Sequence, residues 1–174
     1  EVLLARAAGN AETRGLADRL TLSAALGPVA PADLVLNVGA EHVFGDLGQA
    51  LAKLWPLVGP GGRLLFGTQF WERSPTPALV EAIGELPDLS GLIDAAAAAG
   101  WRPLGLRVAT AQDWDHFEFG FLADWEQFVM APPTLADAER ARQAADDHRA
   151  EYLERRGVLG FAFLTLGRPP DQPA

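Results

Sequence analysis

The sequence predicts an α/β fold: a doubly wound, mostly parallel sheet with helices on both faces and an antiparallel last strand. Three observations predict this class. Short apolar runs of strand length alternate with amphipathic segments through the first part of the chain, which is typical of a parallel sheet covered by helices. The chain has 174 residues, enough for one domain with a substantial core. The order then changes to a strand, two helices and a final strand, so the final strand can insert antiparallel beside its predecessor.

The amino-terminal part is expected to form one helix and one strand. Apolar side chains recur on one helical face over residues 1–8, and the Gly-Asn pair at 9–10 is a stop signal. Residues 20–25, LTLSAA, are a short strand candidate that ends at Gly27.

The segment 31–67 predicts a parallel βαβ unit. Residues 34–38, LVLNV, form an almost continuous apolar run, as expected for a strand buried on both faces. Asp46 can cap a following helix whose leucines and alanines recur with the 3.6-residue period. The glycine-rich turn at 59–62 then precedes a strand over 63–69.

Two helices and a strand are expected next. The first helical region starts at the prolines at 75 and 77 and runs through residue 83; the second helix covers 89–99, and Gly100 ends it. The strand covers 101–110. Because Pro103 and a glycine lie inside it, it favours an edge or bulged position in the sheet.

The last part of the chain predicts a helical pair and a strand. Residues 113–130 hold most of the remaining aromatic side chains in one helix. Two prolines and Thr134 break the chain and cap a long polar helix over 135–156. Residues 160–166, GFAFLTL, form the final strand. We expect one domain over residues 1–168, and a disordered tail over 169–174.

The pattern P-x-D-L-V-x-x-x-x-x-x-H, followed by L-x-x-L-W-x-L-x-x-P-G-G-R-L-L, starts at Pro31 and ends at Leu65. It resembles the middle of a class I S-adenosylmethionine-dependent methyltransferase. The resemblance implies a sheet closed by an antiparallel strand, S-adenosylmethionine as cofactor, and methyl transfer to a small-molecule acceptor. Nicotinamide-binding Rossmann domains lack that antiparallel strand.

The candidate cofactor site is the segment 37–42, where a predicted strand ends. In open α/β sheets, ligands bind outside the carboxyl ends of the strands. The resemblance implies that Asn37, Val38 and Gly39 line the cofactor together with Leu26, and that His42 lies nearer the acceptor. His42 could then act as the catalytic base, because the pKa of an imidazole is near neutrality. From the residues alone, the glycine and asparagine could be turn residues and the histidine a packing residue.

The candidate acceptor site combines two aromatic segments. Phe70 and Trp71 follow the next predicted strand, and Trp114, His116 and Glu118 lie within one aromatic and acidic cluster. Small-molecule pockets are mostly apolar with few polar groups, which this composition fits. The cluster resembles the lid region of small-molecule methyltransferases. The alternative for Phe70 and Trp71 is packing under the following helix, and the alternative for the cluster is core packing with an N-terminal helix cap.

Composition excludes several classes. The net charge of −9 and the pI of about 4.7 argue against a nucleic-acid partner. The chain has no cysteine, and its histidines and acids lack the spacing of a metal site. No apolar run reaches the length of a membrane span, and residues 1–8 lack the basic-then-apolar order of a signal peptide, so we expect no membrane partner and a cytoplasmic protein.

The family's glycine-rich cofactor motif, G-x-G-x-G after the first strand, is absent from this sequence. We therefore expect a chain that lacks the first βαβ part, with an unpaired edge beside residues 34–38. Such a chain is expected to be poorly stable alone, or to be completed by an N-terminal segment or by homo-oligomer formation. Two alternatives remain open: a methyltransferase-like interaction protein that has lost the cofactor loop, and a nicotinamide-dependent oxidoreductase.

Overall fold

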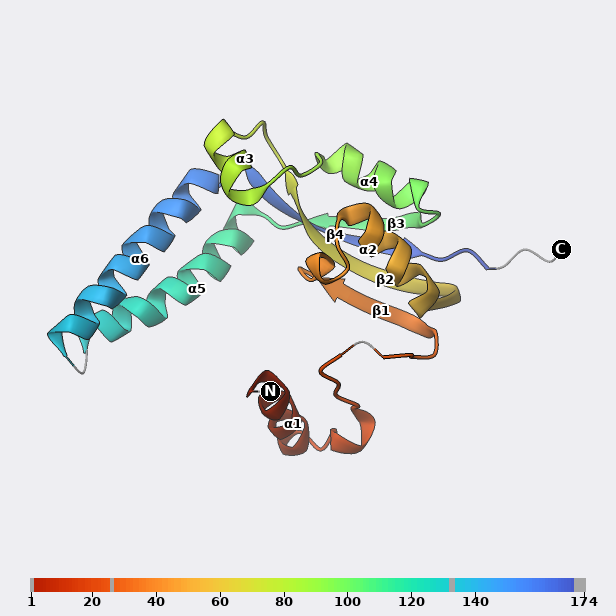
Figure 1. The fold of residues 1–174 in the computed structure, drawn as a ribbon, viewed down its shortest axis with the longest axis horizontal. Coiled ribbons are helices and arrows are strands. Elements are labelled where there is room, and N and C mark those ends of the chain that lie inside the picture. The colour runs from red at the N-terminus through yellow and green to blue at the C-terminus, as the bar shows by residue number, and fades with distance from the viewer. Residues whose placement is uncertain (1, 26, 132–133, 171–174) are drawn as a thin grey trace. The chain divides into compact units, whose positions relative to one another are not determined.

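The computed structural model describes residues 2–25, 27–131 and 134–170 (Figure 1). The chain divides into two compact units, residues 1–31 and 32–174, and each is described here by itself. Whether they form the single domain expected over 1–168 stays a prediction. Residues 171–174 of the expected tail, and Leu26, lie outside the described residues.

The first unit contains the helix α1 (Val2–Thr13) and the short 3₁₀ turn η1 (Ala17–Arg19). The predicted stop at residues 9–10 is wrong, because the helix continues through both residues. Glycine costs only about 1 kcal/mol inside a helix. The helix is closed instead at Gly15, which has a φ of 64°, and the N–H of Leu16 donates to the carbonyl of Ala11 at 2.8 Å.

The strand predicted over residues 20–25 is also wrong. Ser23 Oγ donates to the carbonyl of Ala25 at 2.6 Å and accepts its N–H at 3.3 Å, which is a local turn. An apolar run of this length becomes a strand only with a partner to complete its hydrogen bonds. None of the described strands pairs with it.

The second unit is built on a four-stranded sheet in the order β1-β2-β4-β3. The strands are β1 (Ala32–Val38), β2 (Val58–Trp71), β3 (Arg102–Val108) and β4 (Leu159–Gly167). β1 and β2 are parallel, whereas β4 runs antiparallel to both β2 and β3. The predicted antiparallel last strand is therefore confirmed.

Strands β2 and β3 are irregular. β2 already begins at Val58, ahead of the predicted start at residue 63, and its pairing with β1 shifts register between Ala32 and Leu34. The segment 59–62 is accommodated in this bulge. β3 lies at the sheet edge and shifts register between Pro103 and Gly105, which confirms the predicted edge or bulged position.

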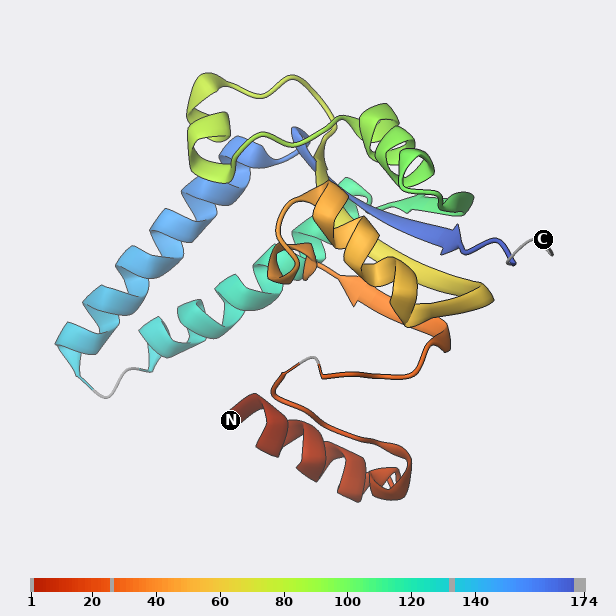
Figure 2. The same ribbon diagram turned by 45° about the vertical axis from the view of Figure 1, so that its right-hand side comes forward.

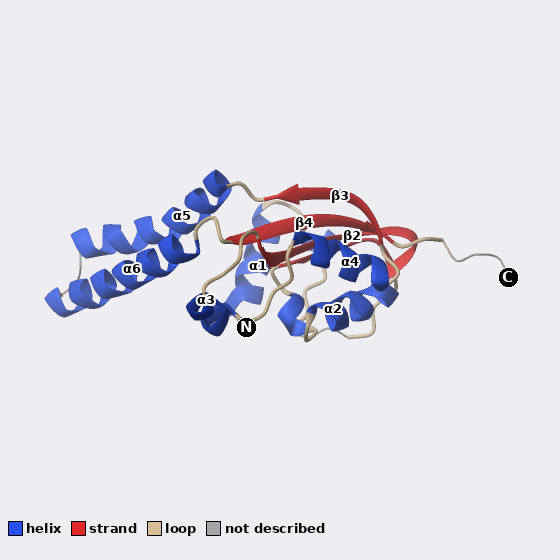
Figure 3. Cartoon of the chain, turned by 90° about the horizontal axis from the view of Figure 1, so that it is seen from above, coloured by secondary structure: helices blue, strands red, loops and turns tan. Residues whose placement is uncertain are grey.

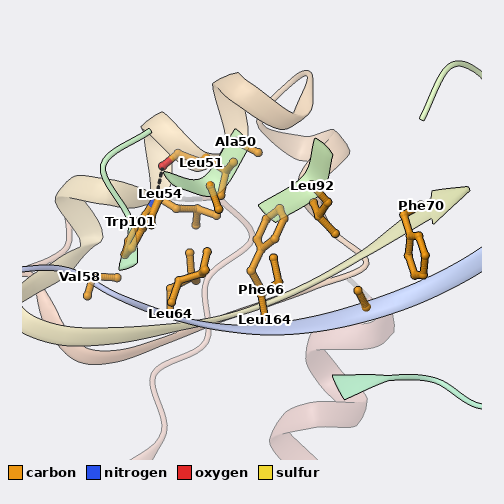
Figure 4. Packing of buried hydrophobic residues seen from close by; sticks show 13 residues of the cluster. Ala50, Leu51, Leu54, Val58, Leu64, Phe66, Phe70, Leu92, Trp101 and Leu164 are labelled. Carbon is orange, nitrogen blue, oxygen red and sulfur yellow. Dashed lines mark hydrogen bonds between the residues drawn. The ribbon is translucent and has the colours of Figure 1, made fainter. Parts of the chain in front are cut away.

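Three capped helices connect these strands, namely α2 (Leu47–Leu54), α3 (Pro77–Ile83) and α4 (Leu89–Ala98). Asp46 accepts the N–H of Gln49 at 2.8 Å, as predicted. Figure 3 shows α2 and α4 on the same side of the sheet. The buried cluster between them and the strands is drawn in Figure 4 and includes Leu51, Leu64, Phe66, Leu92, Trp101 and Leu164.

The other face of this sheet exposes apolar side chains. The exposed fractions of Leu34, Leu36 and Val38 are 58%, 65% and 45%. The expectation that this strand is buried on both faces is therefore wrong in this chain. Parallel strands are buried by helices on each face, and here α2 and α4 pack on one face only. Since β1 ends the strand order, the predicted unpaired edge is confirmed for the described residues.

A helical hairpin joins β3 to β4 (Figures 1 and 2). It consists of α5 (Ala111–Met130) and α6 (Leu135–Arg155), close to the predicted bounds. Thr110 and Asp113 form a capping box at the start of α5. The two helices are joined by side-chain contacts, which bring residues about thirty positions apart into one site.

Candidate functional site

The site begins where β1 ends. The N–H of Gly39 donates to the carbonyl of Gly67 at 2.8 Å, so this residue continues the strand pairing. Its φ of 65° lies in the left-handed region, which favours glycine. A Cβ atom at this position would meet no heavy atom within 4 Å. The backbone after Val38 is therefore held in place yet open on one side.

Two buried acceptor atoms near this strand end have no donor. They are Asn37 Oδ1 and Glu41 Oε2, and neither has a hydrogen-bond partner among the described residues. The other carboxylate oxygen of Glu41 accepts the hydroxyl of Thr68 at 2.9 Å, which fixes the side chain against β2. Buried polar atoms are almost always paired, so these two mark a place for a ligand donor or a water.

A cavity of about 760 Å³ opens between the exposed face of the sheet and the helical hairpin. Val38 and Gly39 lie at one side of it, and residues of β2, β3, β4, α5 and α6 complete its walls. A Cβ atom at position 67 would lie 2.9 Å from both Val38 and Phe161. Gly67 thus allows these two lining side chains to approach each other across β2.

The polar end of the cavity is formed by Glu118, which is 3% exposed. One carboxylate oxygen lies 2.7 Å from Nε2 of His148, and the other accepts from Arg155 at 2.9 Å. The remaining charged lining residues, Arg107 and Asp113, lie 3.5 Å apart. The N–H and hydroxyl of Thr110 donate to Asp113 and lower the pKa of its carboxyl group.

A second polar group fixes the hairpin outside this cavity lining. Asp115 accepts two hydrogen bonds from Arg156, at 2.7 and 2.8 Å, and one from the hydroxyl of Tyr152 at 2.5 Å. These bonds lower the pKa of Asp115, the bonds from Arg156 having the larger effect. Burial, and then the bond to Asp115, raises the pKa of Tyr152 to about 12.

The cavity brings together four of the residues predicted from the sequence. Val38 and Gly39 come from the proposed cofactor segment, and Trp114 and Glu118 from the proposed acceptor segment. The strand end and the aromatic cluster are far apart in sequence, and the sheet places them around one space. Asn37 lies beside this group, but its side chain is buried on the other face of β1.

The other predicted residues lie elsewhere. His42 is exposed in the 3₁₀ turn η2 (Glu41–Val43), and His116 is exposed on α5; neither lines the cavity. Phe70, at 2% exposed, belongs to the main core. Trp71 packs in a smaller cluster with Leu79 of α3. The packing alternative therefore describes the surroundings of these two aromatic residues.

Sequence reasoning missed the α6 side of the cavity. His148 and Arg155 lie on a helix with alternating charges, which indicates a solvated face when it is considered alone. One signal was available: these residues lie seven positions apart, on one helical face, with Tyr152 between them. Phe161 and Phe163 of the last strand were also missed as lining residues.

Comparison with solved structures identifies the fold. A SAM-dependent methyltransferase from Geobacter sulfurreducens, in complex with S-adenosyl-L-homocysteine, is 22% identical with a TM-score of 0.81, over 95% of this chain and 71% of that one. A SAM-dependent methyltransferase from Thiobacillus denitrificans, in complex with the same molecule, is 23% identical with a TM-score of 0.79, over 95% of this chain and 71% of that one. The [4+2]-cyclase SpnF is 19% identical with a TM-score of 0.70, over 98% of this chain and 64% of that one. No protein-family model matches the chain, and no curated protein matches it either.

The chain therefore has the class I methyltransferase fold, as the sequence predicted. The antiparallel β4, which distinguishes this fold from a nicotinamide-binding domain, lies between β2 and β3. Because a cyclase shares the fold, the fold by itself does not determine the reaction.

No described helix combines the length and the apolar character needed to cross a membrane. In the same part of the chain, His, Asp and Glu side chains form no group of three suited to hold a metal ion.

Proposed function

We propose that this chain takes part in S-adenosylmethionine-dependent methyl transfer to a small-molecule acceptor. One observation carries the proposal: the cavity starts at the carboxyl end of β1, in a fold whose solved neighbours hold S-adenosyl-L-homocysteine. Carboxyl ends of strands are where open α/β sheets bind their ligands.

The strand end has groups that fit this cofactor. Asn37 Oδ1 and Glu41 Oε2 are acceptors without donors, and the ammonium group of the methionine moiety is a donor. Gly39 leaves open space beside its backbone. We assign Asn37, Val38 and Gly39 to cofactor binding. When bound, the cofactor supplies an electrophilic methyl group, and the chain has to place an acceptor against it.

The cavity walls would hold that acceptor. Trp114 and its aromatic neighbours exclude water, and Glu118 provides a fixed polar contact. His42, the base proposed from the sequence, remains a prediction, as does a role for His116. A methyl group on a sulfonium is already reactive, so positioning accounts for most of the catalysis this proposal requires.

Isothermal titration of S-adenosyl-L-homocysteine into the chain tests the proposal. We expect saturable one-to-one binding that Gly39→Val abolishes, since a side chain would occupy the open space beside the strand end. Gly84→Val is the matched control, because Gly84 also has a positive φ, of 104°, and open space around it, at the end of α3. Absence of binding by the unmodified chain, or equal loss in both variants, would contradict the proposal.

A further inference from the structure

The polar end of the cavity has the arrangement of an oriented base. The Glu118 carboxylate is almost completely buried, and its two oxygens contact His148 on one side and Arg155 on the other. A carboxylate that accepts from Nε2–H of an imidazole fixes the tautomer and the ring orientation. The Trp125 ring, whose centroid lies 5.5 Å from that of the imidazole and whose plane is nearly perpendicular to it, limits how far the imidazole can turn.

The second ring nitrogen of His148 is the atom left to accept a proton. Within the described part of the chain, Nδ1 has no hydrogen-bond partner, whereas Nε2 is occupied by Glu118. His148 itself lines the cavity. The charged groups lining the cavity with it are Arg107, Asp113, Glu118 and Arg155, two of each sign, so the imidazole does not face an excess of either charge.

Two unpaired donors indicate which ligand atom fits. Trp114 Nε1 and Arg155 Nε are buried and have no acceptor among the described residues, and both residues line the cavity. An ammonium ligand would add further donors to this end of the cavity. A ligand oxygen would instead supply the acceptor that these groups lack.

The remaining walls favour a flat apolar ligand. Phe117, Phe121 and Trp125 follow one another at intervals of one helical turn along α5, and all three line the cavity. Phe161 and Phe163 face them from β4, with ring centroids 5.0 Å apart. Aromatic rings prefer edge-to-face or offset contacts with other rings, which a planar aromatic molecule can provide.

We propose that this cavity binds a planar aromatic compound with a hydroxyl group, and that His148 accepts the hydroxyl proton while Glu118 acts as a positioning residue. In this step the O–H bond breaks, the proton passes to Nδ1 of His148, and the electron pair stays on the oxygen. The products are a phenolate and an imidazolium ion.

The identification of this compound as the methyl acceptor rests on the proposed function. A phenolic hydroxyl has a pKa of about 10, close enough to the value of about 6.5 for imidazole for such a transfer in a stabilising site. Aliphatic hydroxyls are far weaker acids.

Para-nitrophenol tests this step without methyl transfer, because its phenolate absorbs visible light. At a pH where about a tenth of the free compound is ionised, we expect the ionised fraction to rise on the order of threefold on saturation with protein. Quenching of tryptophan fluorescence reports binding separately, since Trp114 and Trp125 line the cavity.

Four variants separate the roles. His148→Gln should still quench the fluorescence but lose the rise in phenolate, and Glu118→Gln should reduce the rise. Glu139→Gln is the control for charge loss, because Glu139 pairs with Arg142 on the exposed surface of α6. No rise with the unmodified chain, an equal rise with His148→Gln, or loss of the rise in His42→Gln alone would overturn the assignment.

The outcome is distinguishable from failure of the proposed function. Binding of S-adenosyl-L-homocysteine without a phenolate signal would refute the aromatic hydroxyl ligand and leave the proposed methyl transfer standing. A phenolate signal that depends on His148, in a chain that does not bind S-adenosyl-L-homocysteine, would support the cavity chemistry and contradict methyl transfer.

Discussion

Replacing Gly160 by alanine tests how β4 packs against β2. Gly160 pairs with Phe70 across the antiparallel strands, and a Cβ atom at position 160 would lie 2.5 Å from two atoms of the phenyl ring. Ordinary contacts of this kind start at 3.4 Å. Because Phe70 is only 2% exposed and belongs to the main core, the ring has no solvent-filled space into which it could move.

The expected change in the free energy of unfolding follows from two opposing effects. Overpacking a core usually destabilises by about 1–3 kcal/mol. Alanine recovers about 0.5–1 kcal/mol of the conformational entropy that glycine loses in a strand. We therefore expect Gly160→Ala to lower the free energy of unfolding by about 1–2 kcal/mol, which corresponds to a fall in Tm of about 2–8 °C for a chain of this size. Urea unfolding followed by circular dichroism measures it.

Two further variants isolate the contact. Gly120→Ala is the matched control, since Gly120 lies inside α5 and its Cβ atom would meet nothing within 4 Å. It should stabilise by about 0.5–1 kcal/mol. Phe70→Leu replaces the ring by a smaller side chain, so it should reduce the destabilisation caused by Gly160→Ala by about 1 kcal/mol. If Gly160→Ala were neutral, or equally costly beside Phe70→Leu, the proposed packing of these strands would be refuted.

Three other predictions concern the hairpin and the core. Tyr152 is the only tyrosine, so tyrosinate absorbance reports it directly: we expect a midpoint near pH 12, which Asp115→Asn should bring toward 10. The folded pKa of Tyr152 lies above the unfolded value, so its protonated hydroxyl contributes to stability. This contribution is complete below pH 10 and is lost as the pH rises through 12, and Tyr152→Phe should remove that loss of stability. Asp115 behaves in the opposite way, because its pKa is lowered in the folded chain. The ionised carboxylate contributes to stability above about pH 4, and this contribution is lost as the pH falls through the folded pKa. Asp115→Asn should abolish this loss of stability in acid unfolding. Trp101→Phe should cost about 1–3 kcal/mol in urea unfolding, because it removes the buried N–H bond to the carbonyl of Leu51.

The elements that could be predicted from the sequence are those with local signals at their ends. Asp46 and Thr134 each accept the N–H of the residue three positions later, so the starts of α2 and α6 follow from a few neighbouring residues. The strand over 20–25 and the burial of both faces at 34–38 depend on partners elsewhere in space. An apolar run shows that a segment can be buried, but not which element buries it.

The candidate site divides in the same way. Glu118 could be predicted, because an acid inside an aromatic cluster is unusual in its local sequence. His148 could not, because thirty positions separate it from Glu118 and its own helix consists largely of charged residues. Glu118 and His148 come into contact only because the hairpin turns α6 back along α5.

Polar contacts set the register of that hairpin, and they connect the polar group around Asp115 with the one around Glu118. Asp115 and Glu118 lie three positions apart on α5, and their partners Tyr152 and His148 lie four apart on α6, in the opposite order. Because the two helices run antiparallel, one turn forward on α5 corresponds to one turn back on α6, so both pairs form together in a single alignment of the helices. Sliding α6 by one turn would break both pairs. The Asp115–Tyr152 contact, outside the cavity lining, thus helps to determine where the imidazole stands.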